Sequence, residues 1–201
     1  AAAVAAGAAM SADPTAPEAS AAPPASLAPF GFEQVASAAQ DRASRAYVAP
    51  GSRLTGAFAD LNYDQYRAIR FRREMDPFAD HPGFRLDLLA PGLIFHEPVQ
   101  INLVREGQAV PVPFDPAMFD FDPALFPPEL DRTATGNMGW SGFRLRTPLN
   151  RPDVMDEFLV FQGASYFRAV ARDTVYGLSA RGLAIRTGSP QGEEFPLFTD
   201  F

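Results

Sequence analysis

The stretch "PVQINLVREGQAVPVPFD", residues 98–115, carries the pattern that decides the fold class. Two runs rich in valine, isoleucine and leucine flank the tripeptide Glu106-Gly107-Gln108. A short link that contains glycine, placed between two strand-like runs, is typical of a β-hairpin. We therefore predict two antiparallel strands here, with the turn at Glu106-Gly107-Gln108.

The chain on either side of this hairpin is also mostly strand-like. Further strands are predicted at residues 69–73, 84–88, 140–150, 156–171 and 175–187, and residues 118–131 are predicted to form a loop or short helix. Apolar residues at helical spacing predict one helix over residues 32–46, and Asn62 is predicted to cap a helical turn that runs through Tyr66. Many short strands with one early helix indicate an all-β fold, a large antiparallel β-sandwich with one short N-terminal helix.

Composition excludes several classes of function. The 201-residue chain has a formal net charge of −7, and every one of its 17 basic residues is arginine. An acidic protein lacks the positive surface that phosphate backbones require, so no nucleic-acid partner is expected. The absence of cysteine removes disulfides, thiolate nucleophiles and cysteine metal ligands.

The first 30 residues differ from the rest. Residues 1–12 form an alanine-rich apolar run that we interpret as the remnant of a signal peptide, and residues 14–29 form a Pro/Ala-rich linker. The alternative is that the whole segment is an alanine-rich linker. No stretch approaches the roughly 20 apolar residues of a membrane span, so a chain that does not span the membrane is expected.

The other end of the chain is apolar as well. The sequence stops at Phe201 directly after an apolar run, which leads us to expect a domain over residues 31–201 that is truncated at its C-terminus. Open strand edges at residues 194–201 are expected to make the isolated chain prone to association.

Familiar catalytic motifs are missing from the sequence. His81 and His96 have no metal-ligand spacing, and neither a GxSxG elbow nor a phosphate-binding glycine loop occurs. The adjacent carboxylates at residues 156–157 and 193–194 would point to opposite faces of a strand, so neither pair forms a close dyad by itself. We expect such groups to face solvent or to pair with arginine. No metal site and no cofactor are expected, and the catalytic residues stay unknown.

Arginines and aromatic residues alternate with small residues in the last third of the chain. Tyr166 and Arg168 share one face of their predicted strand, and Tyr176 and Arg181 belong to the next. Small residues across from a tyrosine and an arginine would leave room for a flat ligand such as a sugar, with the guanidinium as a planar donor. Ordinary interior packing explains the same alternation and stays open. Trp140 is either a stacking platform or core, and we favour core.

Five motifs carry a resemblance to a known family: "LNYDQYRAIRFR", "GFRLRTPLN", "DEFLVFQGASYFRAV", "YGLSARGLAI" and "GEEFPLF". Their order and spacing resemble the N-terminal part of the periplasmic glucan biosynthesis proteins G and D, over roughly residues 32–201. The resemblance implies a galactose-mutarotase-like β-sandwich (a supersandwich), here incomplete and in full-length members followed by a smaller immunoglobulin-like domain. It also implies a periplasmic location and a role in making osmoregulated periplasmic glucans with a β-1,2-linked backbone.

Some members of that family resemble glycoside hydrolases that cut β-1,2-glucan with a carboxylic acid as proton donor. The resemblance implies that the catalytic carboxylates lie past Phe201, so whether this chain is an enzyme is left open. The alternative is a non-catalytic carbohydrate-binding or scaffold protein that escorts nascent glucan beside a membrane glucan synthase. The resemblance makes four residues candidates for a glucan-facing or structural wall: Tyr166, Arg168, Tyr176 and Arg181.

Overall fold

The computed structural model describes residues 29–127 and 138–201, apart from residues 164 and 176. The predicted signal-peptide remnant, most of the predicted linker, the end of the 118–131 stretch and Tyr176 therefore lie outside the described residues. The helices and strands of the described residues, with η marking 3₁₀ turns, are in chain order α1 Phe32–Ala43, η1 Gly56–Phe58, α2 Tyr63–Ala68, β1 Arg70–Phe71, η2 Arg73–Met75, β2 Arg85–Leu89, β3 Ile101–Arg105, β4 Gln108–Val112, η3 Pro116–Met118, β5 Phe119–Asp120, β6 Gly142–Thr147, β7 Asp156–Gln162, β8 Tyr166–Ala169 and β9 Leu178–Arg181.

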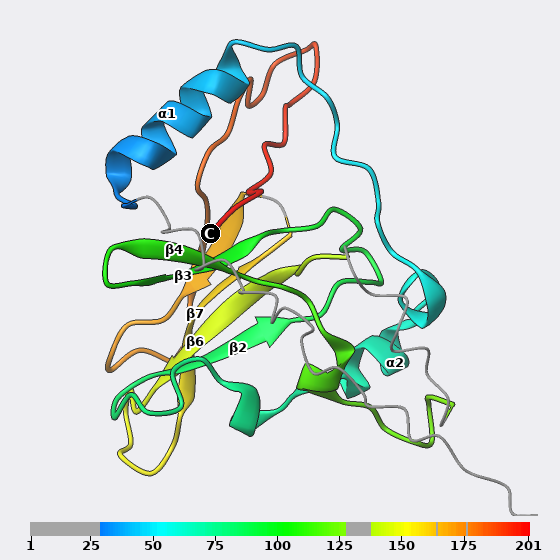
Figure 1. Cartoon of the computed structure of the whole chain (residues 1–201), viewed down its shortest axis with the longest axis vertical. Coiled ribbons are helices and arrows are strands. Elements are labelled where there is room, and N and C mark those ends of the chain that lie inside the picture. Colours follow the sequence, from blue (N-terminus) through cyan, green and yellow to red (C-terminus); the bar gives the residue numbers. More distant parts are fainter. Residues whose placement is uncertain (1–28, 128–137, 164, 176) are drawn as a thin grey trace, which may run out of the picture.

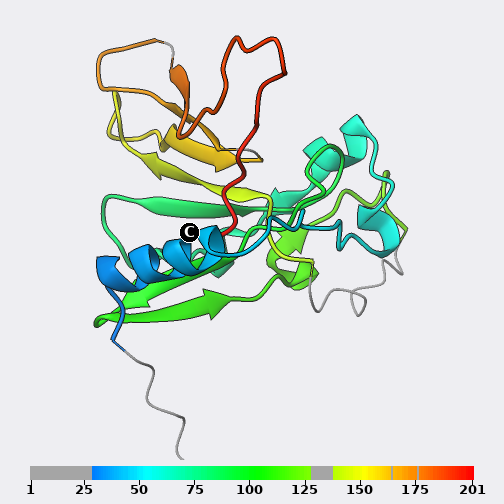
Figure 2. The same ribbon diagram turned by 90° about the horizontal axis from the view of Figure 1, so that it is seen from above.

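The largest element is a five-stranded antiparallel sheet in the order β2-β6-β7-β8-β9. The predicted hairpin forms β3 and β4, and its turn residues Glu106 and Gly107 both have positive φ, of 51° and 74°. Two consecutive left-handed residues give the turn whose twist matches that of the flanking strands. Figures 1 and 2 show this hairpin as a separate layer that lies over one face of the sheet. The antiparallel all-β sandwich predicted from the sequence is confirmed.

The core fills the space between the two layers. Leu86 and Leu88 of β2 point into it and meet Ile101 of β3 and the rings of Phe114 and Trp140. Trp140 is 1% exposed, and its indole nitrogen donates to the carbonyl of Val112 at 2.7 Å. The favoured assignment of Trp140 to the core is confirmed, because a buried indole that is hydrogen-bonded to main chain has no face left for a ligand.

Phenylalanine rings continue the core across the sheet. Phe143 on β6 stacks on Phe161 on β7, with ring centroids 5.4 Å apart, and Phe161 stacks on Phe167 on β8 at 5.1 Å. Phe198 and Phe201 cover this stack from the C-terminal segment. The same segment bonds to the hairpin layer, since Gln100 and Asn102 donate to the carbonyls of Thr199 and Phe201. The apolar run before Phe201 is therefore packed and partly paired, although its predicted tendency to promote association stays a prediction.

Both predicted helices are present. The helix predicted over residues 32–46 is α1, which buries none of its residues and reaches the C-terminal segment through the ion pair of Arg42 with Asp200. The helical turn predicted after Asn62 is α2. Asn62 and Gln65 form a complete capping box there, in which each side chain accepts a hydrogen bond from the other residue's backbone N–H. Neither helix has the length and hydrophobicity that a bilayer crossing needs in the part of the chain that the structure describes.

Three strand predictions need correction. Residues 156–171 were expected to form one strand, but they form β7 and β8, which reverse direction at Gly163, where φ is 74°. The strand expected at residues 69–73 is reduced to β1, because a 3₁₀ turn begins at Arg73. The strand expected at residues 175–187 is reduced to β9.

Candidate functional site

One face of the five-stranded sheet packs against the core, and the opposite face, here called the outer face, carries polar side chains. The alternation of each strand sends its odd and even residues to different faces. The strand register aligns five outer-face residues in one row, one from each strand: Asp87, Arg144, Val160, Arg168 and Ser179. The next row contains Leu89, Gly142 and Gln162.

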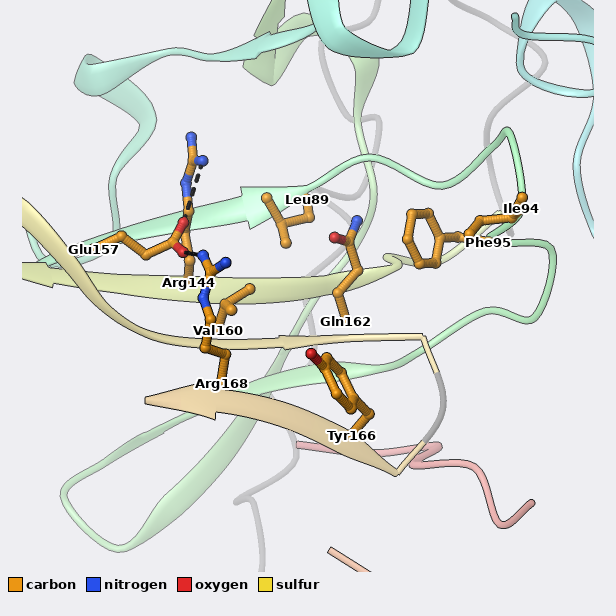
Figure 3. Close-up of a pocket in the computed structure, with 9 residues that line it drawn as sticks. All are labelled: Leu89, Ile94, Phe95, Arg144, Glu157, Val160, Gln162, Tyr166 and Arg168. Carbon is orange, nitrogen blue, oxygen red and sulfur yellow. Dashed lines mark hydrogen bonds and ion pairs between the residues drawn. The ribbon is translucent and has the colours of Figure 1, made fainter. Parts of the chain in front are cut away.

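Ion pairs link the arginines and carboxylates of the outer face. Asp87 Oδ2 accepts from Arg144 Nε at 2.6 Å and from Arg146 Nε at 2.9 Å. Glu157 lies between Arg144 and Arg168 in Figure 3; its Oε2 is 3.5 Å from Arg144 Nη1, and its Oε1 accepts from Arg168 Nη2. Three guanidinium groups thus share two carboxylates. The arrangement holds the arginines in place and leaves Arg168, half exposed at 49%, with donors directed to solvent.

A hollow of about 430 Å³ opens over these rows. Its lining residues, drawn in Figure 3, are Leu89, Ile94, Phe95, Arg144, Glu157, Val160, Gln162, Tyr166 and Arg168. Gly142 lies between Leu89 and Gln162 in the second row. Any Cβ at Gly142 would lie 2.0 Å from the carbonyl oxygen of Phe161, so only glycine fits there.

The loop after β2 forms one wall of the hollow. Gly92 and Phe95 exchange backbone hydrogen bonds of 3.0 and 2.8 Å, which makes a tight turn with Leu93 at a φ of 55°. Phe95 packs over Gly163, where an added Cβ would lie 3.1 Å from the ring. Ile94 and Phe95 also line a second hollow of about 250 Å³, together with Glu97, Gly163, Leu197 and Phe198. The loop therefore stands between two adjoining hollows.

A buried polar network lies under the hollow. Tyr66 on α2 donates its hydroxyl proton to the carbonyl of Ala90 at 2.9 Å, and Ser141 Oγ donates to the same oxygen at 2.8 Å. Gln162 Nε2 donates to both hydroxyl oxygens, at 2.7 Å to Tyr66 and 3.0 Å to Ser141. Burial raises the pKa of Tyr66 above its ordinary value, although the bonds from Ser141 and Gln162 and the nearby charge of Arg144 oppose the shift. Tyr66 is therefore a neutral donor at physiological pH.

The four residues that the sequence predicted as a glucan-facing or structural wall do not all line the hollow. Tyr166 and Arg168 both line the hollow. Arg181 shares their face but lies outside the lining, with its guanidinium 4.7 Å from the centre of the Phe195 ring. Tyr176 lies outside the described residues.

The expectation that small residues lie across from Tyr166 and Arg168 holds for one of the two. Ser179 is the partner of Arg168, but the partner of Tyr166 is Arg181. The Tyr166 hydroxyl reaches diagonally to Ser179 Oγ at 2.7 Å. No β9 residue lines the hollow, so the room for a ligand does not come from a row of small residues on β9.

Of the nine residues that line the hollow, sequence reasoning named only Tyr166 and Arg168 as candidates. The residues that it missed include Phe95, Arg144, Glu157 and Gln162. Arg144 and Glu157 could have been found from the strand alternation that places Arg168 on the same face, given the pairing of β6 with β7. Phe95 and Gln162 carry no local signal, because their positions depend on contacts with α2 and with the start of β6. The expected pairing of carboxylates with arginine is confirmed for Glu157.

The arrangement is suited to binding. It offers fixed guanidinium donors at one end, an aromatic and aliphatic wall at the other, and a floor open to a flat molecule. No three His, Cys, Asp or Glu side chains among residues 29–127 and 138–201 gather closely enough to hold a metal ion. Asp87 and Glu157 are each engaged by two arginines, so both carboxylates hold guanidinium groups in place.

The comparison with known proteins decides the family. Residues 30–201 match the family model described as "Periplasmic glucan biosynthesis protein, MdoG". The chain belongs to the MdoG family. It is 44% identical over 173 residues to the glucans biosynthesis protein G of Ralstonia nicotianae, which covers 86% of this chain and 34% of that protein. The resemblance stated from the sequence motifs is thereby confirmed.

Two further relatives give the same result. The chain is 43% identical to the glucans biosynthesis protein G of Pseudomonas putida, over 86% of this chain and 29% of that protein. It is 43% identical to the protein of the same name from Rhodopseudomonas palustris, over 96% of this chain and 38% of that protein. The chain thus spans about a third of the length of the curated relatives it matches.

Proposed function

We propose that this chain is part of a periplasmic protein of osmoregulated glucan biosynthesis, and that its outer-face hollow binds the β-1,2-linked glucan backbone. The observation that carries the proposal is the hollow itself, in which Arg168, Tyr166 and Phe95 surround an open floor in a chain of the MdoG family. Guanidinium donors suit sugar hydroxyls, and aromatic rings suit the apolar faces of sugar rings. The adjoining second hollow suits a chain of several sugars better than a single one.

In this proposal, residues 31–201 are the N-terminal part of a galactose-mutarotase-like sandwich domain, and residues 1–30 are an export-signal remnant with its linker. The family's description as periplasmic supports the location. The names of the relatives, all glucans biosynthesis protein G, support the choice of glucan as the ligand.

The binding claim is tested by calorimetric titration of the chain with linear β-1,2-gluco-oligosaccharides. Arg168→Ala is expected to weaken binding roughly tenfold, because a hydrogen bond to a charged group contributes about 1.5–3 kcal/mol. Tyr166→Ala is expected to weaken it a few-fold through lost ring contact. Arg172→Ala is the matched control, since Arg172 is exposed and outside both hollows. Equal affinity in all four proteins would remove the case for this hollow.

For the parent protein we propose a glycoside hydrolase-like activity on the glucan backbone, with its acid and base past Phe201. Full-length protein should then release new reducing ends from linear β-1,2-glucan, whereas the 201-residue chain should release none. Release by the 201-residue chain would refute the placement of the acids.

The second candidate is a non-catalytic glucan-binding scaffold beside a membrane glucan synthase. The engagement of Asp87 and Glu157 by arginines favours it for this hollow, because both carboxylates are used to hold donors. If the full-length protein binds β-1,2-gluco-oligosaccharides through Arg168 without cutting them, the non-catalytic scaffold is the correct function.

A further inference from the structure

The side-chain amide of Gln162 has one end fixed inside the protein and the other end facing the hollow. Its Nε2 carries two hydrogens, and two acceptors lie within range: the hydroxyl oxygens of Tyr66 at 2.7 Å and Ser141 at 3.0 Å. Both amide hydrogens are therefore used by the buried network. The residue itself lines the hollow.

The direction of every bond in this network follows from the carbonyl of Ala90. That oxygen can only accept, and Ala90 is buried, so the hydroxyls of Tyr66 and Ser141 donate to it at 2.9 and 2.8 Å. Once each hydroxyl proton is committed to Ala90, each hydroxyl oxygen can only accept from Gln162. With both hydroxyls donating to Ala90, a flipped amide would place its oxygen against the lone pairs of two hydroxyl oxygens. Nε2 therefore points inward.

The amide oxygen is left at the surface of the hollow. No residue among those the structure describes donates a hydrogen bond to Gln162 Oε1. In Figure 3 this oxygen lies beside Leu89, between the charged group of Glu157 with its arginines and the ring of Phe95. It is an acceptor whose direction is set before any ligand arrives, so little ordering is lost on binding.

We propose that Gln162 determines specificity by accepting a hydrogen bond at Oε1 from a hydroxyl of a neutral sugar, and that Tyr66 is the residue that positions it. The inference rests on the proposed function, since it assigns one contact within the same hollow. Because Gln162 Oε1 can only accept, it favours a ligand group that donates a hydrogen bond. An anionic substituent at the same place would bring a second acceptor against Oε1 with no proton between the two atoms, so its binding would be disfavoured. The arginines lie on one side of this acceptor and the Phe95 ring lies on the other, so the ligand has a preferred direction.

A double-mutant cycle tests the division of roles. Gln162→Met keeps the length of the side chain and removes the acceptor, and it should weaken binding of linear β-1,2-gluco-oligosaccharides roughly fivefold. Tyr66→Phe keeps the ring and releases the amide, and it should weaken binding roughly threefold. The double variant should bind no more weakly than Gln162→Met alone, because Tyr66 acts only through Gln162. Losses that multiply in the double variant would overturn the positioning role.

A spectroscopic measurement on the free chain tests the fixed amide without any ligand. The two side-chain amide protons of Gln162 should exchange slowly with water, unlike those of Gln34 on the exposed helix α1. Tyr66→Phe should bring the Gln162 protons close to solvent-like exchange. Fast exchange in the wild-type chain would contradict the proposal. If Tyr66→Phe does not fold, Ser141→Ala removes the other acceptor and serves the same test.

The outcomes separate this inference from the proposed function. Binding that depends on Arg168 but is unchanged in Gln162→Met leaves the glucan-binding proposal in place and rejects the role of Gln162. Absence of oligosaccharide binding by the wild-type chain rejects both.

Discussion

The two faces of the five-stranded sheet are built from the same strands and have opposite chemistry. On the inner face, Phe143, Phe161 and Phe167 stack from strand to strand and meet the hairpin layer. On the outer face, charged residues from neighbouring strands pair with each other around an open hollow. Stability therefore comes mainly from one set of residues, and the proposed recognition of a ligand depends on those that alternate with them.

The largest test of this difference uses two neighbouring leucines of β2. Leu88 is 0% exposed on the inner face, whereas Leu89 lies half-buried at the edge of the hollow. Leu88→Ala should lower the free energy of unfolding by about 2–5 kcal/mol, because it leaves a cavity in the core. Leu89→Ala should cost only about 1 kcal/mol, because less apolar surface is lost. Urea unfolding of both variants measures the two values, and equal losses would mean that the faces do not differ in this way.

A smaller effect is expected from the charges of the outer face. Asp87→Asn removes the anion that holds Arg144 and Arg146, and with an Asp87 side chain that is 19% exposed we expect a loss of about 1–2 kcal/mol. Asp153→Asn is the matched control, because Asp153 pairs with Arg151 on the open surface and should show no measurable change. Chemical denaturation at low and high salt measures the loss in the free energy of unfolding for both variants. If the two substitutions behave alike, the outer-face ion pairs are no stronger than ordinary surface pairs.

The smallest effect concerns the pH dependence of stability. Burial raises the pKa of Tyr66 in the folded chain above its ordinary value near 10. The folded state then holds this proton more tightly than the unfolded state, so stability is unaffected below pH 10 and falls as pH rises above it. The loss is at most about 1.4 kcal/mol per pH unit. Tyr66→Phe should remove this slope in urea unfolding between pH 8 and 11, whereas Tyr63→Phe, at an exposed tyrosine, should keep it.

Local patterns in the sequence predicted much of the fold. The hairpin turn at Glu106 and Gly107, the helix cap at Asn62 and the burial of Trp140 all follow from signals within a few residues. The reversal between β7 and β8 did not, and the reason is geometric. Gln162 and Tyr166 are separated by an even number of positions and face the same side, so the alternation continues through the turn as if the strand were unbroken. Gly163 alone marks the reversal.

The candidate site was predictable only in part. Tyr166 and Arg168 share a strand, and their common face could be read from the sequence. The proposed role of Gln162 depends on its hydrogen bonds to two residues far from it in the sequence. Tyr66 lies 96 residues earlier, and Ser141 lies 21 residues earlier. A contact of that kind has no periodic signal, because it depends on where α2 docks against the start of β6.

The network under the hollow also links binding to the folded population by mass action. Its four members come from α2, the end of β2, the entry to β6 and the end of β7, so they meet only when these parts of the chain are assembled. A sugar that bonds to Gln162 in its fixed orientation therefore has no comparable partner in the unfolded chain. At a concentration one hundred times its dissociation constant, such a ligand would add about 2.7 kcal/mol to the free energy of unfolding. A rise in the melting temperature on addition of an oligosaccharide would then report its binding without any catalytic assay.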